Sequence, residues 1–231
     1  MPSLGMTASR SALTAFLVFG ALSAATGGAD LSQYRDFQLG TALPAVARQV
    51  GISASQAKVI HRRPALIQEL EWRPQPLGSS SQTESAQEVV FSFYDGELFR
   101  IAINYDRHET EGLTAADFIE TISATYGIAE KLTAPANAVR GRYGDQDEIV
   151  ARWQDSQYCF DLIRSSYGPS FRLIGVLKRL QGPAQAAITE AKRLEDQDAP
   201  QREAARIADE KETKRAELEK SRLVNKPKFR P

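Results

Sequence analysis

The sequence predicts an α+β protein in which two tandem helix-strand-strand-strand units form antiparallel sheet with their helices on one face, followed by a charged C-terminal helix. Residues 89–105 and 149–164 each contain two runs of alternating apolar and polar residues divided by a turn sequence, which is typical of β-hairpins. An amphipathic helical pattern precedes each set of strands. The order of elements is therefore repeated, and the fold class follows from that repeat.

The first hairpin, residues 89–105, has its large apolar residues at odd positions in both arms. A two-residue turn at Asp95-Gly96 would put the two sets on opposite faces. We therefore expect a three-residue loop, 94–96, with Gly96 in the left-handed region as a bulge. The predicted pairs are Phe91 with Phe99 and Val89 with Ile101.

In the second hairpin, residues 149–164, a two-residue turn at Asp155-Ser156 brings the apolar residues of both arms onto one face. The predicted pairs are Trp153 with Tyr158 and Ala151 with Phe160. A further strand, 171–178, follows a turn over 165–170 that contains Gly168-Pro169.

Thr41 and Thr114 are the expected N-caps of the two short helices, and Gly51 and Gly127 the expected ends. Asp117 lies in the first turn of the second helix, where a carboxylate is favourable. The Pro-, Gly- and Ser-rich segment 74–87 predicts a mobile surface loop. We prefer one six-stranded sheet, and two separate sheets are the alternative.

Residues 1–29 have the layout of a secretory signal peptide, with Arg10 ahead of the apolar run 13–25. Cleavage after Ala25 or Ala29 fits, and an uncleaved anchor is the alternative. The single cysteine, Cys159, lies far from both sites, so no lipobox is present. We expect an exported protein, periplasmic or secreted, with no transmembrane segment in the mature chain.

The tandem domain is predicted over 30–181, a charged helical tail over 182–224 and disorder over 225–231. A helix from Ala184 should stop at Asp198-Ala199-Pro200. Residues 201–222 alternate charges of both signs, which predicts an exposed single helix or one exchanging with disorder. Apolar residues are too few for a coiled coil, although self-association through the tail stays open. Phe229 is a candidate anchor for a partner.

The 29 basic and 29 acidic residues balance, which gives no electrostatic argument for nucleic acid or an anionic membrane as partner. One cysteine cannot form an internal disulfide, so the domain must be stabilised by burial alone. Cys159 should face away from the core residues beside it and be covered, although an exposed thiol able to form an intermolecular disulfide is the alternative.

Few residues suggest chemistry. Arg62 and Arg63 could bind an anion, or lie at the exposed end of a short strand that includes His61. Asp106 and His108 share a charged segment, but the spacing gives no metal site. No sequence motif for a nucleophile, a metal or a cofactor is present, so we predict no catalytic residue, no cofactor and no metal. Arg62, Arg63, Asp106 and His108 are the candidate ligand residues.

The segment Leu39-Gly40-Thr41 with its short helix, followed by the hairpin around Asp95-Gly96, resembles the small α/β repeat of BamE-like envelope proteins and of β-lactamase-inhibitor-like domains. This resemblance covers residues 36–180 as two copies, and in those families such units mediate protein binding. The tail looks like that of uncharacterised exported bacterial proteins. The chain departs from BamE-like lipoproteins in having no cysteine to lipidate.

These observations lead to the expectation of an exported non-enzymatic protein that binds another protein of the cell envelope, with the charged tail as spacer or secondary contact. The alternative is a small-ligand binder or an enzyme that uses a cleft between the two repeats.

Overall fold

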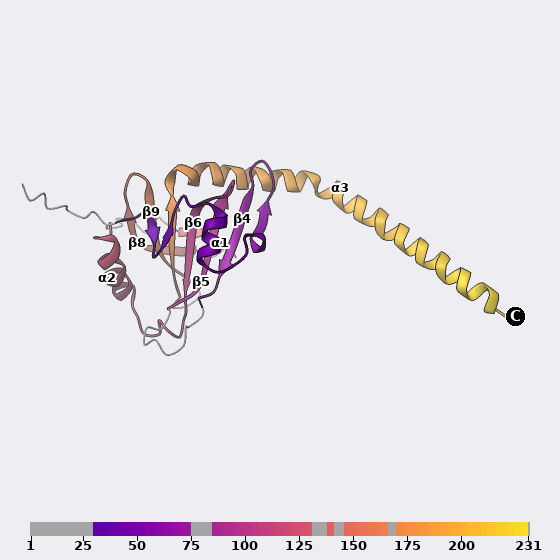
Figure 1. The fold of residues 1–231 in the computed structure, drawn as a ribbon, viewed down its shortest axis with the longest axis horizontal. Helices are drawn as coiled ribbons and strands as arrows, with labels where there is room; N and C mark the ends of the chain where they lie inside the picture. The colour runs from indigo at the N-terminus through magenta and orange to yellow at the C-terminus, as the bar shows by residue number, and fades with distance from the viewer. Residues whose placement is uncertain (1–29, 75–84, 131–137, 141–145, 166–169, 231) are drawn as a thin grey trace, which may run out of the picture.

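The computed structural model describes residues 30–74, 85–130, 138–140, 146–165 and 170–230. They form one eight-stranded antiparallel sheet, a two-stranded ribbon and three α-helices, the last of which extends far beyond the sheet (Figure 1). The predicted α+β class, with its two helix-and-strand units and its C-terminal charged helix, is confirmed.

The strands of the sheet are β3 (Lys58–His61), β4 (Ile67–Trp72), β5 (Ala86–Tyr94), β6 (Glu97–Tyr105), β7 (Ala138–Arg140), β8 (Gln146–Gln154), β9 (Tyr158–Arg164) and β10 (Phe171–Leu177). The other elements are β1 (Gln33–Tyr34), β2 (Phe37–Gln38), α1 (Leu43–Gln49), α2 (Ala115–Tyr126), α3 (Lys178–Asn225) and the 3-10 helices η1 (Ala54–Gln56) and η2 (Lys226–Lys228).

The two predicted units join into a single sheet through their last strands. The strand order is β3-β4-β5-β6-β10-β9-β8-β7, so the second half mirrors the first. At the junction β6 and β10 run antiparallel, with Asn104 opposite Arg172 and Arg100 opposite Val176. Of the two arrangements left open by the sequence, the single sheet is the one observed, extended by the short edge strands β3 and β7.

The predicted register of the first hairpin is wrong. Asp95 and Gly96 form a two-residue turn with φ of 48° and 83°, and Tyr94 pairs with Glu97. The extra residue is Phe99, because Ser92 pairs with Arg100 while Phe93 pairs with Leu98. The observed pairs are Phe91 with Ile101 and Val89 with Ile103. The bulge needed to bring both apolar sets onto one face therefore lies inside β6, not in the turn.

In the second hairpin Ala151 and Trp153 lie on the predicted face but the register is displaced by two residues, and a bulge before Ala151 places Ile149 on the opposite face, paired with Ile163. Trp153 pairs with Phe160 and Ala151 with Leu162, around a turn at Ser156-Gln157. The Asp155 carboxylate fixes this turn by accepting hydrogen bonds from the backbone N–H groups of Gln157 and Tyr158, at 2.6 and 2.7 Å. An acidic side chain just before the turn thus selects its position.

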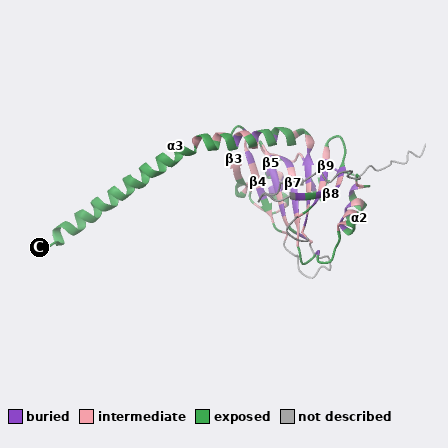
Figure 2. Ribbon diagram, turned by 180° about the vertical axis from the view of Figure 1, so that it is seen from behind, coloured by how far each residue is buried: buried purple, intermediate pink, exposed green. Residues whose placement is uncertain are grey.

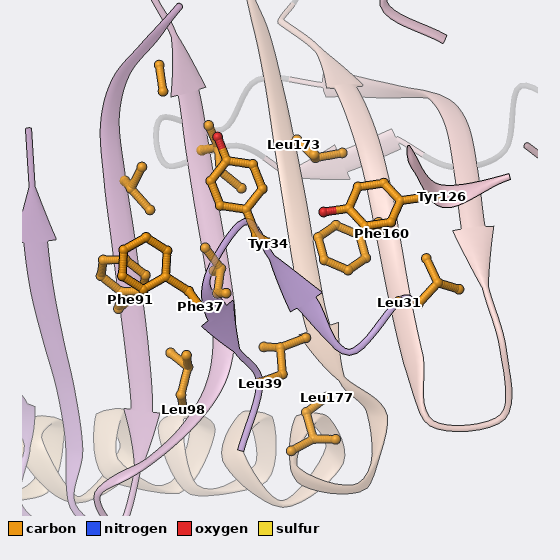
Figure 3. Packing of buried hydrophobic residues seen from close by; sticks show 14 of the residues in the cluster. Leu31, Tyr34, Phe37, Leu39, Phe91, Leu98, Tyr126, Phe160, Leu173 and Leu177 are labelled. Carbon is orange, nitrogen blue, oxygen red and sulfur yellow. The ribbon is translucent and has the colours of Figure 1, made fainter. Parts of the chain in front are cut away.

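One face of the sheet, called the core face here, is covered by α1, α2 and the β1–β2 ribbon. Figure 3 shows Phe37 from the ribbon beside Phe91, and Tyr126 from α2 beside Phe160. The ring centroids of these pairs lie 4.8 and 4.5 Å apart. The ribbon was not predicted from the sequence, although it fills the centre of the core.

The two short helices begin differently. Thr114 caps α2 through a reciprocal capping box with Asp117, as predicted, and these hydrogen bonds hold the pKa of Asp117 below its usual value. The predicted cap at Thr41 is wrong. The backbone carbonyl of Thr41 accepts a hydrogen bond from the backbone N–H of Leu98, so this residue stays extended and α1 begins at Leu43 without a side-chain cap.

Replacing Thr114 with alanine should therefore lower the free energy of unfolding by about 1 kcal/mol, the usual value of a side-chain N-cap. Thr41→Ala is the matched control, because its side chain caps no helix, and it should change stability much less. Urea unfolding of both variants measures the difference. Equal losses at the two positions would contradict the assignment of the caps.

The opposite face of the sheet is crossed by the first part of α3. Ala184, Ala187 and Ala191 are buried there, whereas every described residue from Ala199 onward is exposed (Figure 2). The predicted stop at Pro200 is wrong, since α3 continues through it to Asn225. Figure 1 shows a bend where the helix leaves the sheet, which is the usual effect of a proline inside a helix.

Several predictions fall outside the described residues. They are the signal peptide over 1–29, most of the loop 74–87, and the Gly168-Pro169 turn. The tail end, predicted to be disordered, is described to residue 230 and contains the 3-10 turn η2, all of it exposed.

Candidate functional site

The β3–α3 surface is the place where the sheet edge, α3 and two predicted ligand residues meet. β3 is the first strand of the sheet, and no other described strand pairs with its outer edge. A strand edge of this kind presents backbone N–H and C=O groups that can pair with another chain. α3 crosses beside β3 and continues past it into solvent (Figure 2).

Two polar contacts hold α3 against β3. The buried His61 side chain contacts the Glu195 carboxylate, with Nδ1 and Oε1 2.8 Å apart. Arg63, two residues further on, forms an ion pair with Asp198. The predicted anion-binding role of Arg63 is therefore already met by a carboxylate of the same chain.

A pocket of about 310 Å³ lies between β3 and α3. Its lining residues are Val59, Ile60, Arg62, Arg63, Ala191, Glu195, Asp198 and Arg202. Arg202 donates to the backbone carbonyl of Glu195 at 2.6 Å, and within the described part of the chain neither Arg202 nor Arg62 has a carboxylate partner. The surface thus combines a free strand edge with two available cationic groups.

Asp106 and His108 lie at the opposite end of the sheet. They follow β6, whose nine residues separate them from the β3 end by about 30 Å. The Asp106 carboxylate accepts hydrogen bonds from the backbone N–H groups of His108 and Glu109, at 2.7 and 3.2 Å. The four candidate ligand residues therefore do not form one site, and Asp106 has a turn-forming role.

The junction of the two units holds a smaller hollow of about 210 Å³. There the Arg172 guanidinium donates to the Asn104 side chain at 2.7 Å, and Asn104 donates to Glu88 at 3.1 Å. Pockets for small molecules usually measure about 300 Å³ or more. This hollow is small for a ligand site, whereas a larger pocket, of about 490 Å³, lies between the two units and is lined by Leu39, Ser156, Gln157, Tyr158, Leu177, Lys178 and Arg179.

Among the described residues no group of three or more histidine, cysteine or acidic side chains is arranged to hold a metal ion. The same part of the chain contains no helix with the length and apolarity needed to cross a membrane. The β3–α3 surface itself offers cationic side chains and the backbone N–H and C=O groups of a strand edge.

Cys159 is buried on the face away from Phe160, as predicted. Burial, together with the negative charge of Asp161, raises the pKa of the thiol to about 12. Asp161 in turn binds Arg152 through both carboxylate oxygens, at 2.6 and 2.8 Å. That hydrogen-bonded ion pair raises the pKa of Arg152, so its charge persists at any ordinary pH.

Cys159 should therefore react very slowly with thiol reagents in the folded protein. At pH 8 a pKa near 12 lowers the thiolate fraction by about a thousandfold relative to an ordinary cysteine, and burial slows access further. Ser221→Cys, on the exposed part of α3, is the internal control that should react at once. Complete labelling of Cys159 in the native wild type within minutes would contradict the buried, protonated thiol.

Comparison with protein-family models, with curated proteins and with solved structures found no match. The resemblance to BamE-like and β-lactamase-inhibitor-like repeats therefore stays a prediction. Function has to be inferred from the β3–α3 surface and from the shape of α3.

Proposed function

We propose that this chain is an exported, non-enzymatic protein that binds another protein of the cell envelope through the β3–α3 surface. The free edge of β3 supports this proposal most directly, because an extended segment of a partner can add to such an edge as a further strand. Arg62 and Arg202 border that edge and favour a partner segment with acidic side chains.

The part of α3 beyond the sheet, residues 199–225, acts as a spacer in this proposal. At about 1.5 Å per residue it reaches about 40 Å from the domain. Ion pairs along it, such as Arg206 with Glu203 and Lys214 with Glu210, support a helix that has no neighbour. Ile207 and Leu218 are its exposed large apolar residues before the last two turns, too few for a coiled-coil seam.

Site-specific crosslinking in intact cell envelopes tests the proposal. A photoreactive residue in place of Lys58, exposed on β3, should give one dominant adduct with a second protein. The same residue in place of Glu120, exposed on α2, is the matched control and should not give that adduct. Failure to recover a stoichiometric partner from position 58 would count against the proposal.

A second function, small-ligand binding between the repeats, is favoured by the pocket of about 490 Å³ that Leu39 of the first unit lines together with Tyr158 and Leu177 of the second.

Self-association through the tail is tested separately, by comparing the sedimentation of chains that end at residue 198 and at residue 231. A fall in mass beyond that of the missing residues would indicate assembly through the tail.

A further inference from the structure

The exposed part of α3 and the residues after it differ sharply in charge along their length. Residues 199–218, the shaft, carry five basic and five acidic side chains, whereas residues 219–230, the tip, carry five basic side chains and one acidic one. The overall neutrality of the chain conceals this difference. A strongly basic segment is therefore held at the far end of a neutral helix.

Among the described residues, two of the five shaft cations pair with a carboxylate, against one of the five tip cations. Arg206 and Lys214 in the shaft both pair with Glu210. In the tip Arg222 pairs with Glu219, and among the described residues no carboxylate pairs with Lys226 or Lys228. Basic residues at the C-terminus of a helix stabilise its dipole, and Lys226, the C-cap residue of α3, can do so, whereas Lys228 and Arg230 lie further beyond the helix end.

Large apolar side chains are exposed in the same short segment. Leu223, Val224 and Phe229 are 66%, 52% and 76% exposed. Leu223 and Val224 are neighbours in a helix and so project about 100° apart, while Phe229 follows the helix end. A partner groove that binds a helix needs its apolar residues in one stripe, whereas a surface that receives the end of the helix does not.

We propose that the tip docks on the anionic surface of a lipid bilayer, with Phe229 and its apolar neighbours entering the headgroup region and the surrounding cations facing lipid phosphates. Polybasic segments gain free energy from each cation near such a surface, and short apolar side chains add to it. The shaft then holds the sheet domain about 30 Å away from the membrane. This inference concerns a different part of the molecule from the protein-binding β3–α3 surface and does not depend on it.

A local fluorescence probe tests the tip directly. In the full chain carrying Phe229→Trp, vesicles of phosphatidylglycerol and phosphatidylcholine with brominated acyl chains should quench and blue-shift the added fluorescence, measured as the difference from the wild type with its native Trp72 and Trp153. Vesicles of phosphatidylcholine alone should not. Ile207→Trp is the matched control, because the same substitution in the shaft lies too far from the surface to be quenched. Any binding of the N-terminal residues to the vesicles is the same in both variants, so it cannot account for a difference in quenching between them.

Charge removal gives the second arm of the test. Converting Lys226, Lys228 and Arg230 to glutamine should weaken vesicle binding by the tip roughly a hundredfold. The matched variant with glutamine at Lys211, Lys214 and Arg215 in the shaft should retain it. If the Phe229→Trp variant shows no quenching on anionic vesicles, or equal quenching on neutral ones, the proposal is overturned and an acidic protein becomes the expected partner of the tip.

Discussion

Replacing Gly175 with alanine is expected to lower the free energy of unfolding by about 1–3 kcal/mol, the usual cost of overpacking a core. Gly175 lies on β10 directly opposite Phe160 of β9. A Cβ atom built at this position would lie 2.5 Å from Cε1 of the Phe160 ring. That ring cannot easily move away, because Tyr126 stacks against it with centroids 4.5 Å apart. Urea unfolding measures the loss.

The matched control is Gly182→Ala in α3, where a new Cβ would contact nothing within 4 Å. Alanine is the better helix former by about 1 kcal/mol, so this variant should be more stable than the wild type. Adding Phe160→Leu to Gly175→Ala should recover part of the loss, because the smaller side chain leaves room for the methyl group. A Gly175→Ala protein as stable as the wild type would contradict the close packing of Phe160.

Replacing Ala184 with glutamate is expected to detach the first part of α3 from the sheet. Ala184 is fully buried at this contact, so a glutamate there would have to place its carboxylate inside the packed interface. Burying an unpaired charge costs about 3 kcal/mol or more, so the helix should lift away from the sheet rather than keep the carboxylate dry. Hydrogen exchange of residues 178–198 should then accelerate at least about tenfold.

Ala186→Glu, two residues further along the same helix, provides the control because Ala186 is exposed. It should leave the exchange rates close to those of the wild type. The difference in exchange rate between the two variants depends only on which face of α3 packs against the sheet. Similar exchange in both would show that this face does not pack as described.

Much of the fold could be predicted from residue alternation, yet alternation alone did not fix the register. In the first hairpin one extra residue is needed to bring the apolar side chains of both arms onto one face. An extra residue at Gly96 and one at Phe99 have the same effect on the alternation further along the strand, so the pattern does not distinguish them. In the second hairpin, moving the turn by one position changes each pair by two residues and leaves every side chain on its face. The faces were therefore predictable except at the two bulges, where Phe99 and Ile149 lie off the core face, and the pairs were not predictable.

The β3–α3 surface could be predicted only in part. The sequence indicates that Arg62 and Arg63 end a short strand, but their neighbours Glu195 and Asp198 lie more than a hundred residues later, in a helix predicted to stop at Pro200. A local sequence pattern cannot predict a contact between residues that lie so far apart in the chain. A proline in an exposed helix costs a hydrogen bond and bends the helix, and here the long run of good helix formers on both sides tolerates it.

The mirrored strand order has a consequence for how the sheet assembles. Every observed pairing except that of β6 with β10 joins strands that are consecutive in the chain. Each half can therefore form its pairings by closing short loops, whereas the junction brings together residues such as Asn104 and Arg172, which are 68 positions apart. We therefore expect the pairing of β6 with β10 to be the slow, non-local step of folding, and the docking of α3, which begins directly after β10, to follow it.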